Sequence, residues 1–358
     1  MMLSEYITFR QHLPAPEGMI GEAHAGILEL QRMNRDFNGH ASALCQLLAD
    51  KRRYALMLAG AGFACARLQA IVDPVKTQRN VIALRTATEV EAWLLNTADY
   101  PLFGKPFDSY GSEGAVSITE RDRDTGMLRL VDGRMVAAAE LAAEVATQYG
   151  DRGYLWMDRV VPHETLRRAS GNSVGCVRLV TATTNGVATP LYAIWKIPAA
   201  GAVADNFWRE GNMMAELDIT SGEVRRVAAR GATDKFNVFA QSDTSSQGLK
   251  LPMWDRVLNV GIEAAQLTPE IGIIGFDIAI TDAGPIIIEA NTNPDHRLWQ
   301  MASGRGFMTK YMRDLHANAR QFHKTRKRKL KQQRWTAIRN FKRADLPRVL
   351  DAMFRNKP

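Results

Sequence analysis

Residues 275–294 read GFDIAITDAGPIIIEANTNP, and this stretch decides the fold. Two apolar runs flank Asp282-Ala283-Gly284, which is typical of a tight hairpin turn. We therefore expect two paired strands at 272–281 and 285–291. Isoleucine runs on both strands indicate that both faces of the hairpin are covered by other parts of the protein.

Three oxygen-bearing side chains interrupt these apolar strands. Glu289 and Asn291 share one face because side chains alternate along a strand, and Asp277 on the partner strand can lie opposite them. Buried carboxylates are costly unless a cation compensates them, and carboxylate and amide oxygens suit Mg²⁺. We predict that Asp277, Glu289 and Asn291 bind Mg²⁺ or Mn²⁺; the alternative is the polar outer face of an ordinary hairpin.

The order Asp277, then Glu289-x-Asn291-x-x-Pro294 resembles the metal-binding hairpin of the ATP-grasp superfamily. Residues 275–295 resemble more narrowly its sugar-transfer-associated branch, whose genes accompany surface-polysaccharide synthesis. The resemblance covers roughly residues 45–310. It implies an α+β fold, with two α+β lobes of mostly antiparallel strands that clasp ATP.

The rest of the chain agrees with an α+β protein, because strands and helices follow one another in mixed order and not as a regular parallel repeat. We expect an N-terminal helical region at 1–50, a first lobe at 51–153, a second lobe at 154–310 and a basic helical tail at 311–358. Beyond the hairpin, we expect helices at 135–148, 252–267 and within 296–330, and strands at 67–72, 80–84, 100–106, 114–119, 127–131, 154–161, 174–184, 188–198, 213–219 and 223–228.

A glycine-rich segment follows Lys105 at the end of an expected strand. Glycines let backbone N–H groups approach phosphate oxygens closely, and a lysine adds a point charge. The segment also resembles the ATP-grasp phosphate loop, whereas a lone glycine-rich loop would more simply be solvent-exposed. The resemblance implies ATP contacts from Lys105, Ser109, Gly111, Ser112 and Gly114.

Further ATP contacts are implied by resemblance alone. Residues 50–63 are similar to the segment that opens the nucleotide-binding unit of D-alanine–D-alanine-type ligases, which implies that Lys51 contacts the α-phosphate; a surface lysine is the alternative. The strand at 154–161 resembles the hinge whose backbone binds the adenine edge, here near Asp158, Arg159 and Val160. Asn206 lies in a loop similar to one that contacts ATP or metal.

Two cations stand inside apolar strands, Arg178 and Lys196. They match positions where the branch carries cations that face the transferred phosphate, so the resemblance implies a catalytic role. The alternative for each is an ion pair with a nearby carboxylate, since a buried cation needs an anionic partner. His296, shortly after the hairpin, is a further candidate to face the substrate.

The resemblance implies an ATP-dependent ligase that activates a carboxylate as an acylphosphate for attack by an amine. D-alanine-type ligases carry an arginine two residues before the first metal carboxylate, where this chain has Gly275. Either Arg178 substitutes for it, or the acceptor is a sugar or small-molecule hydroxyl and the protein is a kinase.

The net charge of +8 is concentrated at one end of the chain. Residues 320–345 contain eleven Lys or Arg and one acid, so the remainder carries about −2. This tail predicts contact with an anionic membrane surface more than with nucleic acid, and a solvated basic helix is the simplest alternative. Three scattered cysteines and the absence of a signal or spanning segment favour a cytoplasmic protein, with association at the inner membrane face as an option.

Overall fold

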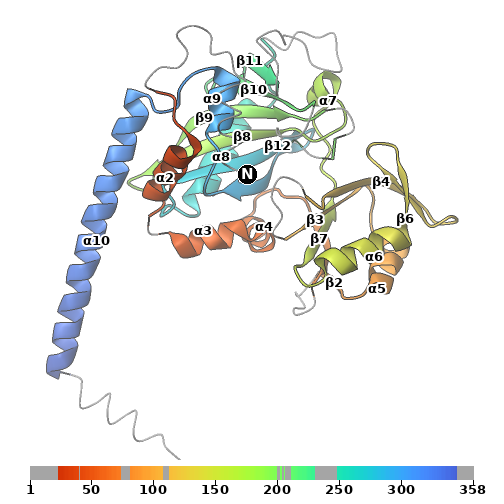
Figure 1. Cartoon of the computed structure of the whole chain (residues 1–358), viewed down its shortest axis with the longest axis horizontal. Coiled ribbons are helices and arrows are strands. Elements are labelled where there is room, and N and C mark those ends of the chain that lie inside the picture. Colours follow the sequence, from red (N-terminus) through yellow and green to blue (C-terminus); the bar gives the residue numbers. More distant parts are fainter. Residues whose placement is uncertain are drawn as a thin grey trace, which may run out of the picture. The chain divides into compact units, whose positions relative to one another are not determined.

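The computed structural model describes residues 23–39, 41–73, 81–107, 113–199, 202–203, 205, 211–229 and 248–344. The chain divides into two compact units, residues 1–309 and 310–358. The first unit contains two β-sheets, each covered by helices (Figure 1). Ser109, Gly111, Ser112 and Asn206 lie outside the described residues.

The first sheet has seven strands in the order β2-β1-β7-β3-β4-β5-β6. Every pairing is antiparallel except that of β1 with β2. Helices α5 (Ala87–Asn96) and α6 (Ala138–Tyr149) pack together against it, around a core that includes Trp93 and Trp156. The strands are β1 (Leu68–Val72), β2 (Ile82–Leu84), β3 (Leu102–Pro106), β4 (Val116–Asp122), β5 (Met127–Leu130), β6 (Met135–Ala137) and β7 (Tyr154–Asp158).

The second sheet has six strands in the order β11-β10-β9-β8-β12-β13, all antiparallel. Helix α8 (Trp254–Gln266) packs on it closely, because Gly261 lets Leu179 approach the helix backbone. The strands are β8 (Cys176–Thr184), β9 (Val187–Ile197), β10 (Met213–Leu217), β11 (Val224–Ala229), β12 (Ile273–Thr281) and β13 (Gly284–Asn291). The antiparallel α+β architecture predicted from the sequence is confirmed.

Three N-terminal helices are attached to the second sheet: α2 (Ile27–Phe37), α3 (Ser42–Ala49) and α4 (Lys51–Gly60). Leu48 and Leu58 lie in the same hydrophobic cluster as the strands of that sheet. Asn38, just after α2, donates from Nδ2 to the carbonyl oxygens of Ile273 at 3.1 Å and Thr292 at 2.7 Å. These bonds attach the N-terminal helices to both chain segments at the open end of the hairpin.

Several elements differ from the sequence-based expectation. Strand β7 ends at Asp158, three residues early, and pairs with β1 and β3, so it belongs to the first sheet although residue 154 was expected to open the second lobe. The pattern did not indicate β6, α5 or α7 (Glu164–Ser170). A capping signal for α5 was nevertheless present: Thr86 caps the N–H of Glu89 at 3.1 Å, while Glu89 accepts from the N–H of Arg85.

The helices expected after the hairpin are present as α9 (Arg297–Ser303) and α10 (Lys310–Ala344). Helix α9 ends at Gly304, whose φ of +69° suits the left-handed position after a helix. Helix α10 belongs to the second compact unit and runs for 35 residues. None of the helices in the described ranges has the length and apolar character needed to cross a bilayer.

Candidate active site on the β12–β13 hairpin

The hairpin register brings the predicted oxygen-bearing residues onto one face. Asp277 lies directly opposite Glu289, and Gly275 lies opposite Asn291. The pairing then shifts between Asp277 and Ile278, so that Ile288 is an extra residue on β13. Such a bulge re-aims the neighbouring side chains and is common beside functional sites. Asn291 Nδ2 donates to Glu289 Oε1 at 3.2 Å, so these two side chains lie together.

Arg178 and Lys196 both bind Asp277. Arg178 donates from Nε to Asp277 Oδ1 and from Nη2 to Oδ2 at 2.8 Å, and Lys196 Nζ donates to Oδ2 at 2.8 Å. Burial favours the neutral form of Asp277, but the charges of Arg178 and Lys196 outweigh it and hold the pKa of this carboxyl well below its usual range. The two cations predicted as catalytic therefore pair with a local carboxylate, which is also the first predicted metal ligand.

Asp205 is a member of this cluster that the sequence did not indicate. Its Oδ1 accepts from Lys196 Nζ at 2.9 Å, and its Oδ2 accepts from the backbone N–H of Cys176 at 2.8 Å. Its neighbour Asn206, which was predicted instead, lies outside the described residues. The signal available in the sequence was the place of Asp205 directly before Asn206, in the loop that resembles one that contacts ATP or metal.

Lys105 reaches this cluster from the other sheet. It lies on β3, its residue is only 8% exposed, and no carboxylate among the described residues is within ion-pair distance of its Nζ. Burial is the main cause that lowers the pKa of Lys105, and the negative charges of Glu289 and Asp277 oppose this shift. The site thus contains a buried amine, supplied by the first sheet, whose charge interacts with the carboxylates of the second sheet and which has no ion-pair partner among the described residues.

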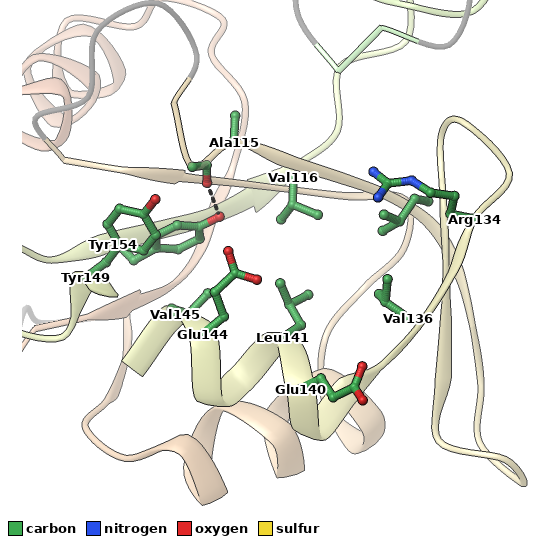
Figure 2. A pocket seen from close by; sticks show the side chains of 12 residues that line it. Ala115, Val116, Arg134, Val136, Glu140, Leu141, Glu144, Val145, Tyr149 and Tyr154 are labelled. Atoms are coloured by element: carbon green, nitrogen blue, oxygen red, sulfur yellow. Dashed lines mark hydrogen bonds between the residues drawn. The ribbon is translucent and has the colours of Figure 1, made fainter. Parts of the chain in front are cut away.

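The backbone conformation and the packing at position 114 both require glycine, independently of any contact with ATP. Its φ is +69°, and a Cβ at this position would collide with the ring of Tyr149. Its carbonyl oxygen accepts from the hydroxyl of Tyr154 at 2.8 Å. Gly114 also lines a cavity of about 280 Å³ between β4–β6 and α6, into which Glu144 and Leu141 point (Figure 2). The lining contains none of the charged cluster, so this cavity is separate from the hairpin site.

The predicted adenine hinge has two backbone N–H groups that are already engaged. The N–H of Asp158 donates to the Arg67 carbonyl, and the N–H of Arg159 donates to the Pro101 carbonyl, both at 2.9 Å. Among the described residues, no hydrogen bond is made by the N–H of Val160. Of the three predicted hinge contacts, Val160 is therefore the donor best placed for an adenine edge, and the role stays a prediction.

Lys51 is the first residue of α4, a helix that contacts strand β13 of the hairpin. The next residue, Arg52, is buried instead: its Nη1 pairs with Asp73 at 3.0 Å, and its guanidinium lies 5.2 Å from the ring centre of Phe107. Phe107 directly precedes the predicted phosphate loop. Arg52 is therefore the cation of this helix that approaches the loop, and the assignment of Lys51 stays a prediction.

His296 does not face a substrate. It is fully buried, its Nδ1 lies 2.8 Å from the hydroxyl of Tyr192, and its Nε2 lies 2.7 Å from Asn34 Oδ1. Its ring stacks on Phe307 with centroids 4.2 Å apart. Burial is the main cause that lowers the pKa of His296 to about 3. This histidine connects α2 to the segment after the hairpin as a neutral side chain.

The buried neutral His296 predicts a loss of stability in acid. The unfolded chain binds a proton at this histidine near pH 6.5, whereas the folded protein resists it down to about pH 3, so stability is full above pH 6.5 and declines below it. Between pH 7 and 4.5, the wild type should lose about 2–3 kcal/mol more of unfolding free energy than His296→Gln. Urea denaturation at both pH values checks this, and equal losses in both proteins would contradict it.

The donor set fits a magnesium ion that carries phosphate groups. Within the described residues, no three His, Cys, Asp or Glu side chains gather as a metal site. The hairpin provides two carboxylates and an amide, and the Glu289 side chain is 31% exposed. Mg²⁺ commonly takes one or two carboxylates and completes its shell with water and substrate phosphates. The buried amine of Lys105 would pair with the same phosphates.

The chain is similar to known proteins at the level of a family and of solved structures. The family model "Sugar-transfer associated ATP-grasp" matches residues 32–314. Among solved structures, the chain is similar to a biotin carboxylase–β,γ-ATP complex from Campylobacter jejuni (13% identity, TM-score 0.45, 77% of this chain and 46% of that one). It is also similar to the D-alanine–D-alanine ligase from Coxiella burnetii (14% identity, TM-score 0.45, 81% and 62%).

The matched region thus spans about half to two thirds of the length of these structures. No curated protein matches the sequence. The family match covers most of the chain, including both sheets and the hairpin that joins Asp277 to Glu289. The chain belongs to the sugar-transfer associated ATP-grasp family and has the fold of the ATP-grasp enzymes, the class that includes ATP-dependent ligases.

Proposed function

We propose that this protein is a Mg-ATP-dependent ligase that activates a carboxylate as an acylphosphate for attack by an amine, in the synthesis of surface polysaccharide or a related metabolite. The observation that carries the proposal is the buried Lys105 of the first sheet, whose charge interacts with Glu289 and Asp277 of the second sheet and which has no ion-pair partner among the described residues. A buried uncompensated cation is costly, and a nucleotide phosphate would offset that cost.

Each charged residue has a role in this proposal. Glu289, Asn291 and Asp277 hold the metal ion, and Lys105 binds the phosphates on the side of the first sheet. Arg178 and Lys196 stabilise the negative charge on the group in transfer, and Asp205 positions Lys196 through its 2.9 Å ion pair. Mg-ATP supplies the phosphoryl group; the contribution of the protein is position and charge, as is usual in phosphoryl transfer.

The surroundings of Gly275 favour the ligase over a kinase. A Cβ at Gly275 would lie 3.1 Å from Arg178 Cδ and 3.0 Å from Pro294 Cβ. The aliphatic part of the Arg178 side chain therefore fills the space above Gly275, and the Arg178 guanidinium donates a hydrogen bond to Asp277. This supports Arg178 as the substitute for the arginine that D-alanine-type ligases carry two residues before the first metal carboxylate. Phosphorylation of a hydroxyl is the second candidate on the same fold.

Lys105→Met tests nucleotide binding. We expect about a 10- to 100-fold weaker affinity for Mg-ATP, because a charge-assisted contact to phosphate is lost. The melting temperature should not fall, since the variant removes a buried charge without an ion-pair partner among the described residues. Titration calorimetry and thermal melting measure both effects, with Lys250→Met as an exposed-lysine control. Unchanged Mg-ATP affinity would sink the proposed role.

Product analysis separates the two reactions. The protein is incubated with Mg-ATP and panels of uronic acids, amino acids and sugars, and products are identified by mass spectrometry. An amide formed together with ADP supports the ligase. A stable phosphate ester on a hydroxyl would instead establish the kinase.

A further inference from the structure

Helix α10 concentrates cationic charge in a single straight element. It spans Lys310–Ala344 as one uninterrupted helix (Figure 1) and contains thirteen Lys or Arg and one acid, Asp314. At 1.5 Å per residue, its length is about 50 Å. Surface helices that pack on their own protein usually carry both signs of charge, so a net charge this large indicates a polyanionic partner.

The cations are not spread evenly around α10. With 3.6 residues per turn, six of the seven exposed cations whose side chains are described fall within an arc of about 80°, and the seventh, Lys329, lies outside it. We call this set the basic arc: Lys310, Arg313, Arg320, Lys324, Arg328 and Lys331. A helix that was merely solvated would have no need for this one-sided arrangement.

A second set of residues follows another side of α10. Tyr311, Leu315, Ala319 and Phe322 recur at spacings of four, four and three, which places them in one stripe roughly opposite the basic arc. Tyr311 is 63% exposed and Phe322 is 48% exposed. We call this set the apolar stripe. Over residues 310–324, helix α10 is therefore amphipathic, with cations on one side and aromatic and aliphatic residues on the other.

We propose that α10 binds the surface of an anionic phospholipid membrane and lies in the plane of the headgroups. The apolar stripe faces the acyl chains, while the basic arc lies at the level of the lipid phosphates, which is the arrangement that in-plane amphipathic helices adopt. A nucleic-acid backbone would use the basic arc but leave the apolar stripe in water, so the stripe favours the membrane. This inference does not depend on the reaction proposed above.

The test is flotation of the full-length protein with lipid vesicles. We expect binding to vesicles of phosphatidylcholine mixed with phosphatidylserine and none to phosphatidylcholine alone. The double variant Lys324→Gln/Arg328→Gln should bind about 25-fold more weakly, from about fivefold per lost charge. Phe322→Ser should also weaken binding, because it removes apolar area from the stripe.

A matched control is Arg123→Gln/Lys250→Gln, which removes the same charge from exposed positions outside α10 and should bind as the wild type does. Equal losses in the two double variants, or no binding to the anionic vesicles, would overturn the inference. A single-stranded RNA added in competition distinguishes the other polyanion. One outcome is that RNA releases the protein from vesicles at an RNA phosphate concentration below that of the lipid phosphate. If it does, and if Phe322→Ser binds vesicles as the wild type does, the partner is nucleic acid and not a membrane.

Discussion

Glu289→Gln is expected to lower Mg-ATP turnover by about a thousandfold, because it removes the charge of a proposed metal ligand, and such a ligand contributes several kcal/mol to the transition state. The fold should survive. The Glu289 side chain is 31% exposed, and its closest ion-pair partner, Arg178 Nη2, is 4.0 Å away. Glutamine keeps the shape and the hydrogen-bond acceptor for Asn291, so the free energy of unfolding should change by less than about 1 kcal/mol.

Two measurements check this expectation. Release of ADP with the acceptor found by product analysis reports turnover, and calorimetry with ATP at increasing Mg²⁺ reports the metal separately. The affinity of the wild type for ATP should rise with Mg²⁺, and that of Glu289→Gln should respond little. Glu263→Gln, an exposed change on α8, is the matched control. A Glu289→Gln protein with normal turnover and a normal Mg²⁺ response would remove the hairpin from the proposed mechanism.

Asp277→Asn should behave differently from Glu289→Gln, because it damages the fold as well as the reaction. The Asp277 carboxylate is buried and accepts hydrogen bonds from both Arg178 and Lys196. Its neutral replacement leaves two buried cations with one carboxylate fewer. Breaking a buried ion pair from one side typically costs about 3–5 kcal/mol, so the melting temperature should fall by many degrees.

A double-mutant cycle isolates this effect. In the Lys196→Met background, Asp277→Asn should cost less unfolding free energy than in the wild type, since one of the two stranded cations is already gone. Urea denaturation of the four proteins gives the coupling energy. Additive effects would mean that Asp277 and Lys196 are not coupled, and the assignment of Asp277 as the counter-ion of Lys196 would then be wrong.

The local elements of this protein were predictable because their signals lie within a few residues. Alternating apolar runs around Asp282-Ala283-Gly284 indicated the hairpin, and the strand pairing confirmed its register at Asp277 and Glu289. The helix at α8 and the antiparallel strands of both sheets also followed from periodicity and turns. Short elements were missed, among them α7 and β6, because two turns of helix or three residues of strand carry little periodic signal.

The composition of the site was only partly predictable. The sequence identified Arg178 and Lys196 as buried cations, but the choice between catalytic groups and ion-pair partners depended on distances that no spacing encodes. Asp205 was overlooked for the same reason, since its partner Lys196 lies on a different element. His296 was expected near the substrate, yet it is enclosed by Tyr192, Asn34 and Phe307, which come from three separate segments.

By itself, the sequence determined the antiparallel α+β architecture, the hairpin register and the residues that could carry charge into it, because strand alternation and turn chemistry act over short range. Only the tertiary structure decided that Asp277 pairs with two cations while Glu289 is partly exposed, and that Lys105 comes from the other sheet. The electrostatic energy of these groups depends on burial and on distances between strands far apart in the chain, and those appear only when both sheets are assembled.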